Sequence, residues 1–319
     1  MKTKIKTAEF VSPKHPDKIC DYIADSILDT YLAEDKNSRV AVEVIAGHGL
    51  VTVNGEVTSK ADPDLEPIIK KIVGENAQVT INLSRQSEYI AQGVDTGGAG
   101  DQGIMKGYAT SETESMLPRE YELARNLCKK VFEKYPYDGK TQVTIEVEGE
   151  KFKIKTVVVS FQNSKNEELL LLVKSIIDAE EYLINPAGEW ETGGFDADTG
   201  LSGRKIVVDA YGPEVPVGGG SFSGKDYTKV DRSGAYIARK IAVDFVRLGK
   251  AKEVFVKLAY AIGKPEPVMA VAILDGKEIK IEGYDLTPAG IKNVLELDKV
   301  KYAETSQWGH FGHSEFPWE

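Results

Sequence analysis

A repeated order of elements constrains the fold of this sequence more than any other feature. Three amphipathic segments begin near residues 15, 118 and 231, which are 103 and 113 positions apart. Their apolar residues recur at helical spacing, and each is followed by two segments in which apolar and polar residues alternate, as in strands. The pattern predicts an α+β fold of three similar units in a pseudo-threefold arrangement, each a sheet with helices on one face. Three unrelated α+β modules would give the same pattern.

The expected elements divide the chain into linear units of residues 1–96, 110–190 and 191–319. Long helices are expected over about residues 17–33 and from about residues 118 and 231 onward. Strands are expected at residues 39–44, 50–57, 141–147, 153–161, 253–258 and 268–274, and shorter helices near residues 65–73, 167–177 and 287–297. Glycine-rich loops at residues 91–103, 185–205 and 218–226 separate the units, and such loops let the backbone approach a ligand closely. We therefore expect a functional site in these loops.

The charge balance argues against one broad class of function. The 319 residues include 40 Lys and Arg against 50 Asp and Glu, so the formal net charge is −10. A general binder of nucleic acid or anionic membrane needs a positive surface, so we expect neither partner. The two cysteines, Cys20 and Cys128, lie in amphipathic segments, which is typical of core thiols in a reducing compartment. No apolar run approaches the roughly 18 residues of a membrane span, and we expect a cytoplasmic protein.

The segment from Gly218 to Asp231 is a candidate phosphate-binding loop. It combines glycines with Lys225, Asp226 and Lys229 directly before an expected helix. Exposed backbone N–H groups and two lysines one turn apart attract phosphate. The order of glycine, four residues, glycine and lysine approaches a Walker loop, but Asp226 stands where a Ser or Thr would hold Mg²⁺. We predict a phosphate loop of another kind, and a flexible glycine turn is the alternative.

A second candidate opens the first helix, in the sequence His15-Pro-Asp-Lys18. A histidine at this position can contact phosphate or exchange a proton near neutral pH, and Asp17 could bind Mg²⁺. The alternative is an ordinary helix start followed by a solvated acidic stripe, because Asp21, Asp25 and Asp29 continue at four-residue spacing.

Two further charged motifs are expected to have structural roles. The sequence Gly203-Arg-Lys205 precedes an expected strand at residues 206–209, and surface salt bridges are the default for such a cation pair. His310 and His313 are too few for a zinc site, which needs three or four ligands, so we expect packing or a subunit contact.

Taken together, these motifs resemble those of the S-adenosylmethionine synthetases over essentially the whole chain. The matching strings are His15-Pro-Asp-Lys18, Gly55-Glu56, Gln92-Gly-Val-Asp95, Gly98-Ala-Gly-Asp-Gln-Gly103, Lys140-Thr-Gln-Val-Thr144, Asn185-Pro186, Gly200-Leu-Ser-Gly-Arg-Lys205, Gly218 to Asp226, Lys229-Val-Asp-Arg232, Tyr260-Ala-Ile-Gly263 and Gly309-His-Phe-Gly312. The resemblance implies three units interleaved along the chain and a methionine adenosyltransferase. In that reaction the sulfur of L-methionine attacks C5′ of ATP, and the tripolyphosphate leaves and is cleaved to pyrophosphate and phosphate. Because negative charge develops on the leaving group, preorganised cations should be the main source of rate enhancement.

The resemblance also implies roles for individual residues. The catalytic residues would be His15, Lys140, Arg204, Lys225 and Lys229. ATP would be bound by these five and by Lys205, Asp198 and Trp190, the last in place of a Phe that stacks near adenine. Methionine would be bound by Glu56, Gln92, Asp101, Asp198 and Ile262. Asp17 and Asp231 would hold Mg²⁺, about two ions per site, and Glu43 would help to hold K⁺. Active sites in the family lie between subunits, which implies a homo-oligomer, a dimer at minimum.

Three features depart from the family pattern. Only Thr96 and Gly97 lie between Asp95 and Gly98, where relatives carry a longer loop that is thought to gate the active site. The sequence also ends without the usual C-terminal helix, and Asn163 replaces a frequent histidine. We expect an active, compact enzyme with a more open site, weak product retention and broader tolerance of methionine analogues. A catalytically silent nucleotide-binding subunit and a tripolyphosphatase without alkyl transfer are the alternatives.

Overall fold

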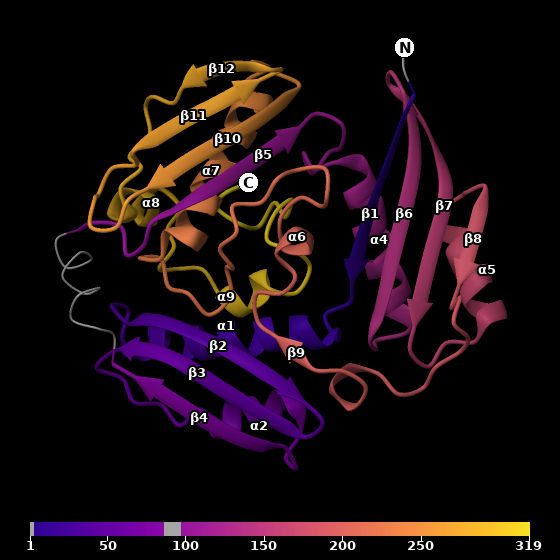
Figure 1. Ribbon diagram of the computed structural model, residues 1–319, viewed down its shortest axis with the longest axis horizontal. Helices are drawn as coiled ribbons and strands as arrows, with labels where there is room; N and C mark the ends of the chain where they lie inside the picture. The colour runs from indigo at the N-terminus through magenta and orange to yellow at the C-terminus, as the bar shows by residue number, and fades with distance from the viewer. Residues whose placement is uncertain (1–2, 86–96) are drawn as a thin grey trace.

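Three four-stranded sheets form the framework of the protein. The computed structural model describes residues 3–85 and 97–319. Figure 1 shows the three sheets set around a centre that is filled by loops and short helices. The α+β fold of three sheet-and-helix units that the repeated pattern predicts is confirmed.

Each sheet has helices on one face. The first sheet has the order β1 (Lys4–Val11), β6 (Gly139–Glu148), β7 (Lys151–Phe161) and β8 (Glu181–Ile184), with helices α4 (Arg119–Lys134) and α5 (Asn166–Ile176). The second has the order β12 (Lys277–Lys280), β11 (Met269–Leu274), β10 (Glu253–Tyr260) and β5 (Gly103–Thr110), with α7 (Val230–Arg247) and α8 (Pro288–Val294). The third has the order β4 (Gln78–Ser84), β3 (Leu50–Thr58), β2 (Arg39–Gly47) and β9 (Gly200–Leu201), with α1 (Pro16–Glu34) and α2 (Glu66–Val73). The single turns η1 (Gly194–Asp196), α6 (Ile206–Asp209) and α9 (Tyr302–Thr305) lie between these units.

One edge strand of each sheet comes from a distant part of the chain. The N-terminal strand β1 pairs antiparallel with β6, strand β5 pairs antiparallel with β10, and the short strand β9 pairs antiparallel with β2. The units are therefore interleaved along the chain, as the family resemblance implies. Because these strands connect one unit to the next, the loops beside them lie where the units meet.

One expected strand is a helix. Residues 206–209 form the single turn α6, in which the N–H of Asp209 donates to the carbonyl of Lys205. Tertiary contacts explain the difference, because the Tyr121 hydroxyl donates to the Val208 carbonyl and the buried Asp209 carboxylate accepts from Lys18. A strand at this position would carry these groups away from their partners.

The apolar side chains form two clusters. The larger joins the first and second sheets through α4 and α7, and the smaller lies between α1, α2 and the third sheet. Cys128 belongs to the larger and Cys20 to the smaller, and both are fully buried free thiols, as expected. Among the described residues, no helix is both long and apolar enough to cross a membrane.

The last residues complete the larger cluster. Trp318 is fully buried and stacks on Tyr236 at 3.7 Å between ring centroids, and the Glu319 carboxylate pairs with buried Arg239 at 2.6 Å.

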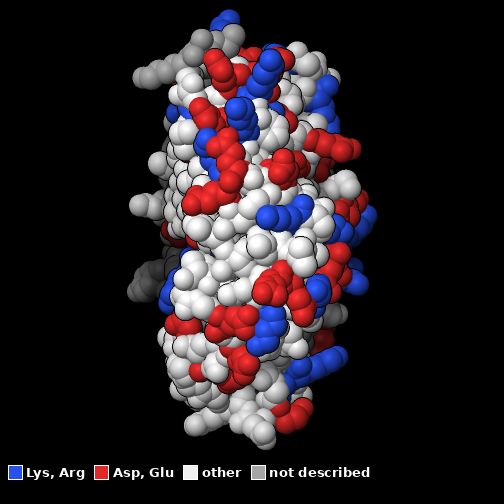
Figure 2. Space-filling view, turned by 90° about the vertical axis from the view of Figure 1, so that its right-hand side faces the viewer, with Lys and Arg blue, Asp and Glu red and all other residues white. Residues whose placement is uncertain are grey.

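Acidic and basic side chains are interspersed on the face of the molecule shown in Figure 2. The charged groups that the sequence singles out therefore have to be sought in local clusters.

Candidate functional site

The first charged cluster forms where α1 begins. His15 is the N-cap of α1, and its Nδ1 accepts a hydrogen bond from the N–H of Asp17 at 3.2 Å. Pro16 follows as the first helical residue, where its fixed backbone angle is favourable and a missing N–H costs nothing. One oxygen of the buried Asp17 accepts from the N–H of Leu201, and the other lies 2.5 Å from Lys205 Nζ.

Other expected site residues surround this helix start. Arg204 Nε lies 3.4 Å from Asp17, and Lys140, at the start of β6, lies 3.3 Å from Glu9 and remains about half exposed. Lys140 and Asp198 are both close enough to shift the pKa of His15. We call this set the His15 cluster, and its members are His15, Asp17, Lys140, Asp198, Arg204 and Lys205. Three segments far apart in the sequence thus supply one site.

His15 is held in its neutral form. Burial, together with the positive charge of Lys205, lowers its pKa to about 4, so the ring is uncharged at neutral pH. Because Nδ1 accepts a hydrogen bond from the backbone, the proton of the neutral ring lies on Nε2. The His15 side chain, which is 16% exposed, therefore offers a hydrogen-bond donor to a ligand oxygen.

The acidic residues of α1 are buried, so the prediction of a solvated stripe is wrong. Asp17, Asp21 and Asp25 have no exposed surface, and Asp29 is partly buried. Each accepts backbone N–H groups from a different segment of the chain. The donors are Leu201 for Asp17, Gly203 for Asp21, Gly224 for Asp25, and Tyr302 and Ala303 for Asp29. We call these four residues the carboxylate row of α1.

The physical reason is that loops, and not water, cover this helix face. Residues four positions apart lie one above another on a helix, so the row meets several loops in succession. The loops carry backbone N–H groups that regular structure leaves unpaired, and a carboxylate accepts such donors strongly. The same loops bear the cationic residues of the candidate site.

Lys18 lies among these acids as their buried counter-ion. Its Nζ donates to Asp21 at 2.9 Å and also to Asp209 of α6. Two buried carboxylates thus share one ammonium group. Burial raises the pKa of Asp209 to about 7, and burial also raises the pKa of Asp21, while both carboxylates raise the pKa of Lys18.

The second charged cluster forms around the loop before α7. Lys225 Nζ lies 2.8 Å from Asp231, and Lys225 forms an antiparallel bridge with Ala41 of β2. Glu43 on β2 and Glu56 on β3 lie on the same side of the third sheet, and burial raises the pKa of Glu43 while Lys225 lowers it. We call this set the Lys225 cluster, and its members are Glu43, Glu56, Lys225, Lys229 and Asp231.

The loop that carries Lys225 is fixed on both sides of that residue. The N–H of Gly224 donates to Asp25 at 2.8 Å, and the carbonyl of Lys225 accepts from Arg232 at 3.1 Å. Gly224 has φ +79°, and a Cβ there would lie 2.1 Å from the Val42 carbonyl oxygen, so only glycine fits. The loop is therefore bound to α1, α7 and β2 by directed hydrogen bonds.

Asp226, which occupies the hydroxyl position of a Walker loop, has a structural role. It is fully buried, and one carboxylate oxygen accepts from the N–H of Val40 and pairs with Lys229 at 2.6 Å. This position thus attaches the loop to β2 and orients a lysine.

The residues that the resemblance assigns to methionine lie partly beside the Lys225 cluster. The segment before β5 pairs with the one after β10, because the N–H of Gly263 donates to the carbonyl of Ala99 at 2.9 Å. Asp101 and half-exposed Ile262 lie on these two segments. Gln92 lies outside the described residues, as does the shortened loop up to Thr96.

Trp190 lies in the loop that leads to η1. Its carbonyl accepts from the N–H of Asn163 at 2.9 Å, and its buried indole N–H has no partner within residues 3–85 and 97–319. Four residues later, the N–H of Gly194 donates to the Asp138 carboxylate at 3.0 Å. Burial raises the pKa of Asp138, and both Asp198 and Lys140 act on it. This loop therefore borders the His15 cluster.

Sequence reasoning missed three residues that organise the site. Asp25 and Arg232 form a fully buried ion pair with two N–O distances of 2.7 and 2.8 Å, and Asp138 holds the Gly194 loop. The four-residue spacing of the acids was the available signal for Asp25. His310 and His313 are packed as expected, since His310 is fully buried with Nδ1 2.7 Å from the Tyr236 hydroxyl and His313 contacts the Trp308 carbonyl.

Comparison with known proteins identifies relatives along the whole sequence. Sequence models of the N-terminal, central and C-terminal domains of S-adenosylmethionine synthetase match residues 3–91, 96–190 and 192–319. An S-adenosylmethionine synthase of Thermus thermophilus is 41% identical over 377 residues, covering 99% of this chain and 95% of its own length. Enzymes of the same name from Salinibacter ruber and Borreliella afzelii are 40% and 41% identical, each over 98% of this chain and 94% of their own length. These alignments are longer than the chain itself, so the relatives carry segments that this chain lacks.

Proposed function

The chain belongs to the S-adenosylmethionine synthetase family and is a transferase, and on that premise we propose how its residues form S-adenosylmethionine from ATP and L-methionine. The sulfur of methionine attacks C5′ of ATP, the C5′–O bond breaks with its electron pair on the oxygen, and tripolyphosphate leaves. Water then cleaves the tripolyphosphate to pyrophosphate and phosphate. The two clusters of charged residues, drawn from distant segments, are the observation that supports this reaction.

The lysines and arginine of both clusters would stabilise the leaving group. Sulfur becomes a positively charged sulfonium while negative charge grows on the departing phosphate, so fixed cations lower the barrier. Lys205 is held 2.5 Å from Asp17 and Lys225 2.8 Å from Asp231, so each ammonium is positioned before a ligand arrives. Phosphate oxygens can replace part of these carboxylate contacts without moving the backbone.

His15 would act as a neutral donor and not as a charged group. Its low pKa and its Nδ1 contact leave Nε2–H available for an oxygen of the ribose or the phosphate chain. A donor that is fixed by the helix N-terminus needs little reorganisation in the transition state.

Mg²⁺ would be held by Asp17 and Asp231. Carboxylate oxygens suit this hard cation, which keeps several waters and takes only one or two protein ligands beside substrate phosphates. Within the described residues, no group of three or more acidic, histidine or cysteine side chains is arranged to hold a metal alone, which agrees with a site completed by ATP. When bound, the metal supplies positive charge that neutralises the phosphate oxygens. Glu43, a member of the Lys225 cluster, would contribute an oxygen ligand for K⁺.

We further propose a cytoplasmic homodimer in which each site combines the His15 cluster of one chain with the Lys225 cluster of another. Asp17 and Asp25, which anchor the two clusters, are eight residues apart on α1, or about 12 Å along its axis. Large apolar side chains are exposed beside the Lys225 cluster, including Ile45, Ile104 and Ile262, each between 46% and 49% exposed. Covering these residues with a second chain would remove apolar surface from water.

Two inactive variants test the reaction and the shared site together. Lys205→Ala disrupts one cluster and Lys225→Ala the other, and each should lose methionine-dependent S-adenosylmethionine formation. If sites are shared, unfolding and refolding an equal mixture of the two variants gives half heterodimers with one intact site each, and about a quarter of wild-type activity returns. If each chain holds a complete site, no activity returns. ATP hydrolysis that does not depend on methionine would indicate a tripolyphosphatase, and ATP binding without turnover a silent subunit.

A further inference from the structure

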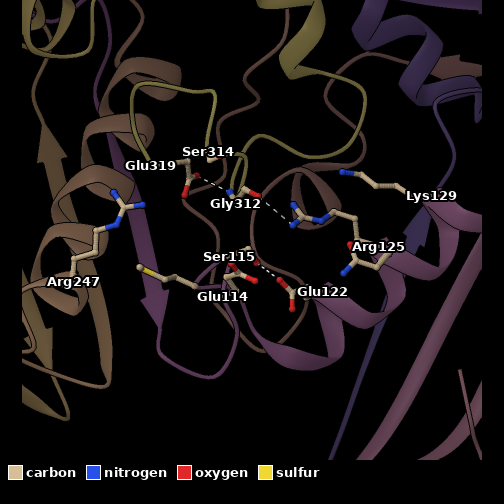
Figure 3. Close-up of a pocket in the computed structure, with 11 residues that line it drawn as sticks. Glu114, Ser115, Glu122, Arg125, Lys129, Arg247, Gly312, Ser314 and Glu319 are labelled. Atoms are coloured by element: carbon tan, nitrogen blue, oxygen red, sulfur yellow. Dashed lines mark hydrogen bonds between the residues drawn. The ribbon is translucent and has the colours of Figure 1, made fainter. Parts of the chain in front are cut away.

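A cavity lies away from both charged clusters. Its volume is about 340 Å³, and it is bounded by α4, the end of α7, the turn after β5 and the C-terminal segment (Figure 3). None of its lining residues belongs to the His15 cluster or the Lys225 cluster. Figure 3 shows Arg125 and Lys129 of α4 extending into it from one side and Arg247 of α7 from the other.

In the part of the chain that the structure describes, these three cations have no carboxylate partner. Within residues 3–85 and 97–319, no acidic oxygen lies within ion-pair distance of Arg125, Lys129 or Arg247. Arg125 is only 3% exposed, and its Nη1 donates to the Phe311 carbonyl at 2.6 Å. Its Nε is buried and has no hydrogen-bond partner among the described residues. A buried donor that is left unpaired is unfavourable, so the guanidinium has unused capacity for an acceptor.

The acids that line the cavity do not supply this acceptor. Glu319 pairs with Arg239 and accepts from the N–H of Gly312, and Glu122 accepts from the hydroxyl of Ser115. Glu114 is the third acid, and it is exposed to solvent. Of these three acids only Glu319 has a cationic partner, and within the described residues none of the three cations is ion-paired, so the unpaired groups leave an excess of one positive charge.

The titration of neighbouring groups agrees with this excess of positive charge. Burial and repulsion by Arg125 lower the pKa of Lys129 to about 8, and the weaker attraction of Glu315 does not offset them. Burial and the charges of Arg125 and Lys129 lower the pKa of His313 to about 4, and its ring nitrogen lies 3.5 Å from Arg125 Nη1. An anion in the cavity would relieve both repulsions.

We propose that this cavity binds a small phosphate-bearing anion at a site separate from the ATP and methionine site. The planar forks of Arg125 and Arg247 match the oxygens of a phosphate group, and Lys129 adds a compact positive charge. A cavity of about 340 Å³ lies within the range of small-molecule sites, so it has room for a phosphomonoester as well as for inorganic phosphate. This inference does not depend on the proposed reaction.

The side-chain resonances of Lys129 provide the test, because they report on this cavity and not on the catalytic clusters. The pKa of Lys129 is measured by a pH titration of lysine-labelled protein. The titration is repeated in inorganic phosphate, pyrophosphate, glycerol 3-phosphate and sodium chloride at matched ionic strength. We expect a phosphate compound, but not chloride, to raise the pKa of Lys129 by about one unit or more. A response to all three compounds would identify the phosphate group as the recognised feature, and a response to the ester alone would add recognition of its organic part.

Two variants and one matched control complete the test. Arg247→Gln should raise at least tenfold the concentration of phosphate compound that is needed for the Lys129 response. Lys129→Gln should remove the assigned resonance, and it should also remove the heat of binding that accompanies the response. Lys130→Gln changes an exposed neighbour on α4 that pairs with Glu133, and it should leave binding unchanged. The proposal is overturned if Lys129 does not respond to any phosphate compound, if chloride gives the same response, or if Arg247→Gln leaves the affinity unaltered.

Discussion

Removing the charge of Asp25 tests whether the carboxylate row of α1 holds the loops of the candidate site. Asp25 accepts from Arg232 through both oxygens and from the N–H of Gly224. Both members of the ion pair are fully buried, and Arg232 also donates to the carbonyl of Lys225. Asp25→Asn keeps the shape of the side chain but leaves the charge of Arg232 uncompensated inside the protein.

The expected loss of stability is large for a single substitution. Breaking a buried ion pair by removing one partner destabilises a protein by about 3–5 kcal/mol, because the remaining charge keeps its desolvation penalty. With an unfolding entropy of about 2.1 cal/mol/K per residue, the 319-residue chain should lose about 4–8 °C in Tm. The catalytic rate should also fall in the folded variant, because Gly224 and Lys225 lose a shared anchor.

A double-mutant cycle measured by thermal and urea unfolding gives the coupling between the two side chains. The variants are Asp25→Asn, Arg232→Met and their combination. The free energy of unfolding lost in the double variant should be smaller than the sum of the two single losses by at least about 1 kcal/mol. The control is Glu296→Gln, which breaks an exposed pair with Lys299 of similar length, 2.7 Å, and should cost about 0–1 kcal/mol. If Asp25→Asn changed stability no more than this control, the anchoring role of the buried pair would be refuted.

Three further outcomes are expected. Gly224→Ala should lower both Tm and the catalytic rate, because its Cβ would lie 2.1 Å from the Val42 carbonyl oxygen; full activity in this variant would mean that the loop can move at no cost. Lys225→Ala should reduce kcat by about 100-fold or more while the protein stays folded by circular dichroism. His15, whose pKa is about 4, should show no NMR titration near pH 6.5. Because the buried histidines are neutral in the folded protein, the free energy of unfolding should fall as pH falls from 6.5 toward 4, by up to about 1.4 kcal/mol per pH unit for each histidine. A histidine resonance that titrates near 6.5 and disappears in His15→Gln would contradict this assignment.

The long helices could be predicted from sequence because their apolar spacing survives in the structure. Helices α1, α4 and α7 begin within one residue of the expected positions, and the strands β2, β3, β6, β7, β10 and β11 overlap the expected segments. The sequence does not predict six strands, namely β1, β4, β5, β8, β9 and β12. Each lies at an end of its sheet's order. Exposed residues interrupt the alternation in β4, and β8, β9 and β12 have four residues or fewer.

The charged residues of the candidate site could be named from sequence, but their arrangement could not. Helical spacing shows that Asp17, Asp21 and Asp25 share one face, yet it does not distinguish water from loop backbone as the partner of that face. The partners lie about 180 to 200 positions further along the chain, at Leu201, Gly203 and Gly224. Only the interleaved topology brings those loops to α1, and hydrophobic periodicity carries no information on it.

The carboxylate row gives α1 a role beyond packing, because one rigid helix sets the relative positions of both clusters. Four residues of an α-helix rise about 6 Å, so successive carboxylates hold successive loops at fixed steps along the axis. Asp17 binds the loop of Lys205, and Asp25 binds the loop of Lys225. A substitution within either loop should therefore disturb one cluster alone. A change that displaces α1 should instead disturb both, since neither loop could keep its hydrogen bonds without following the helix.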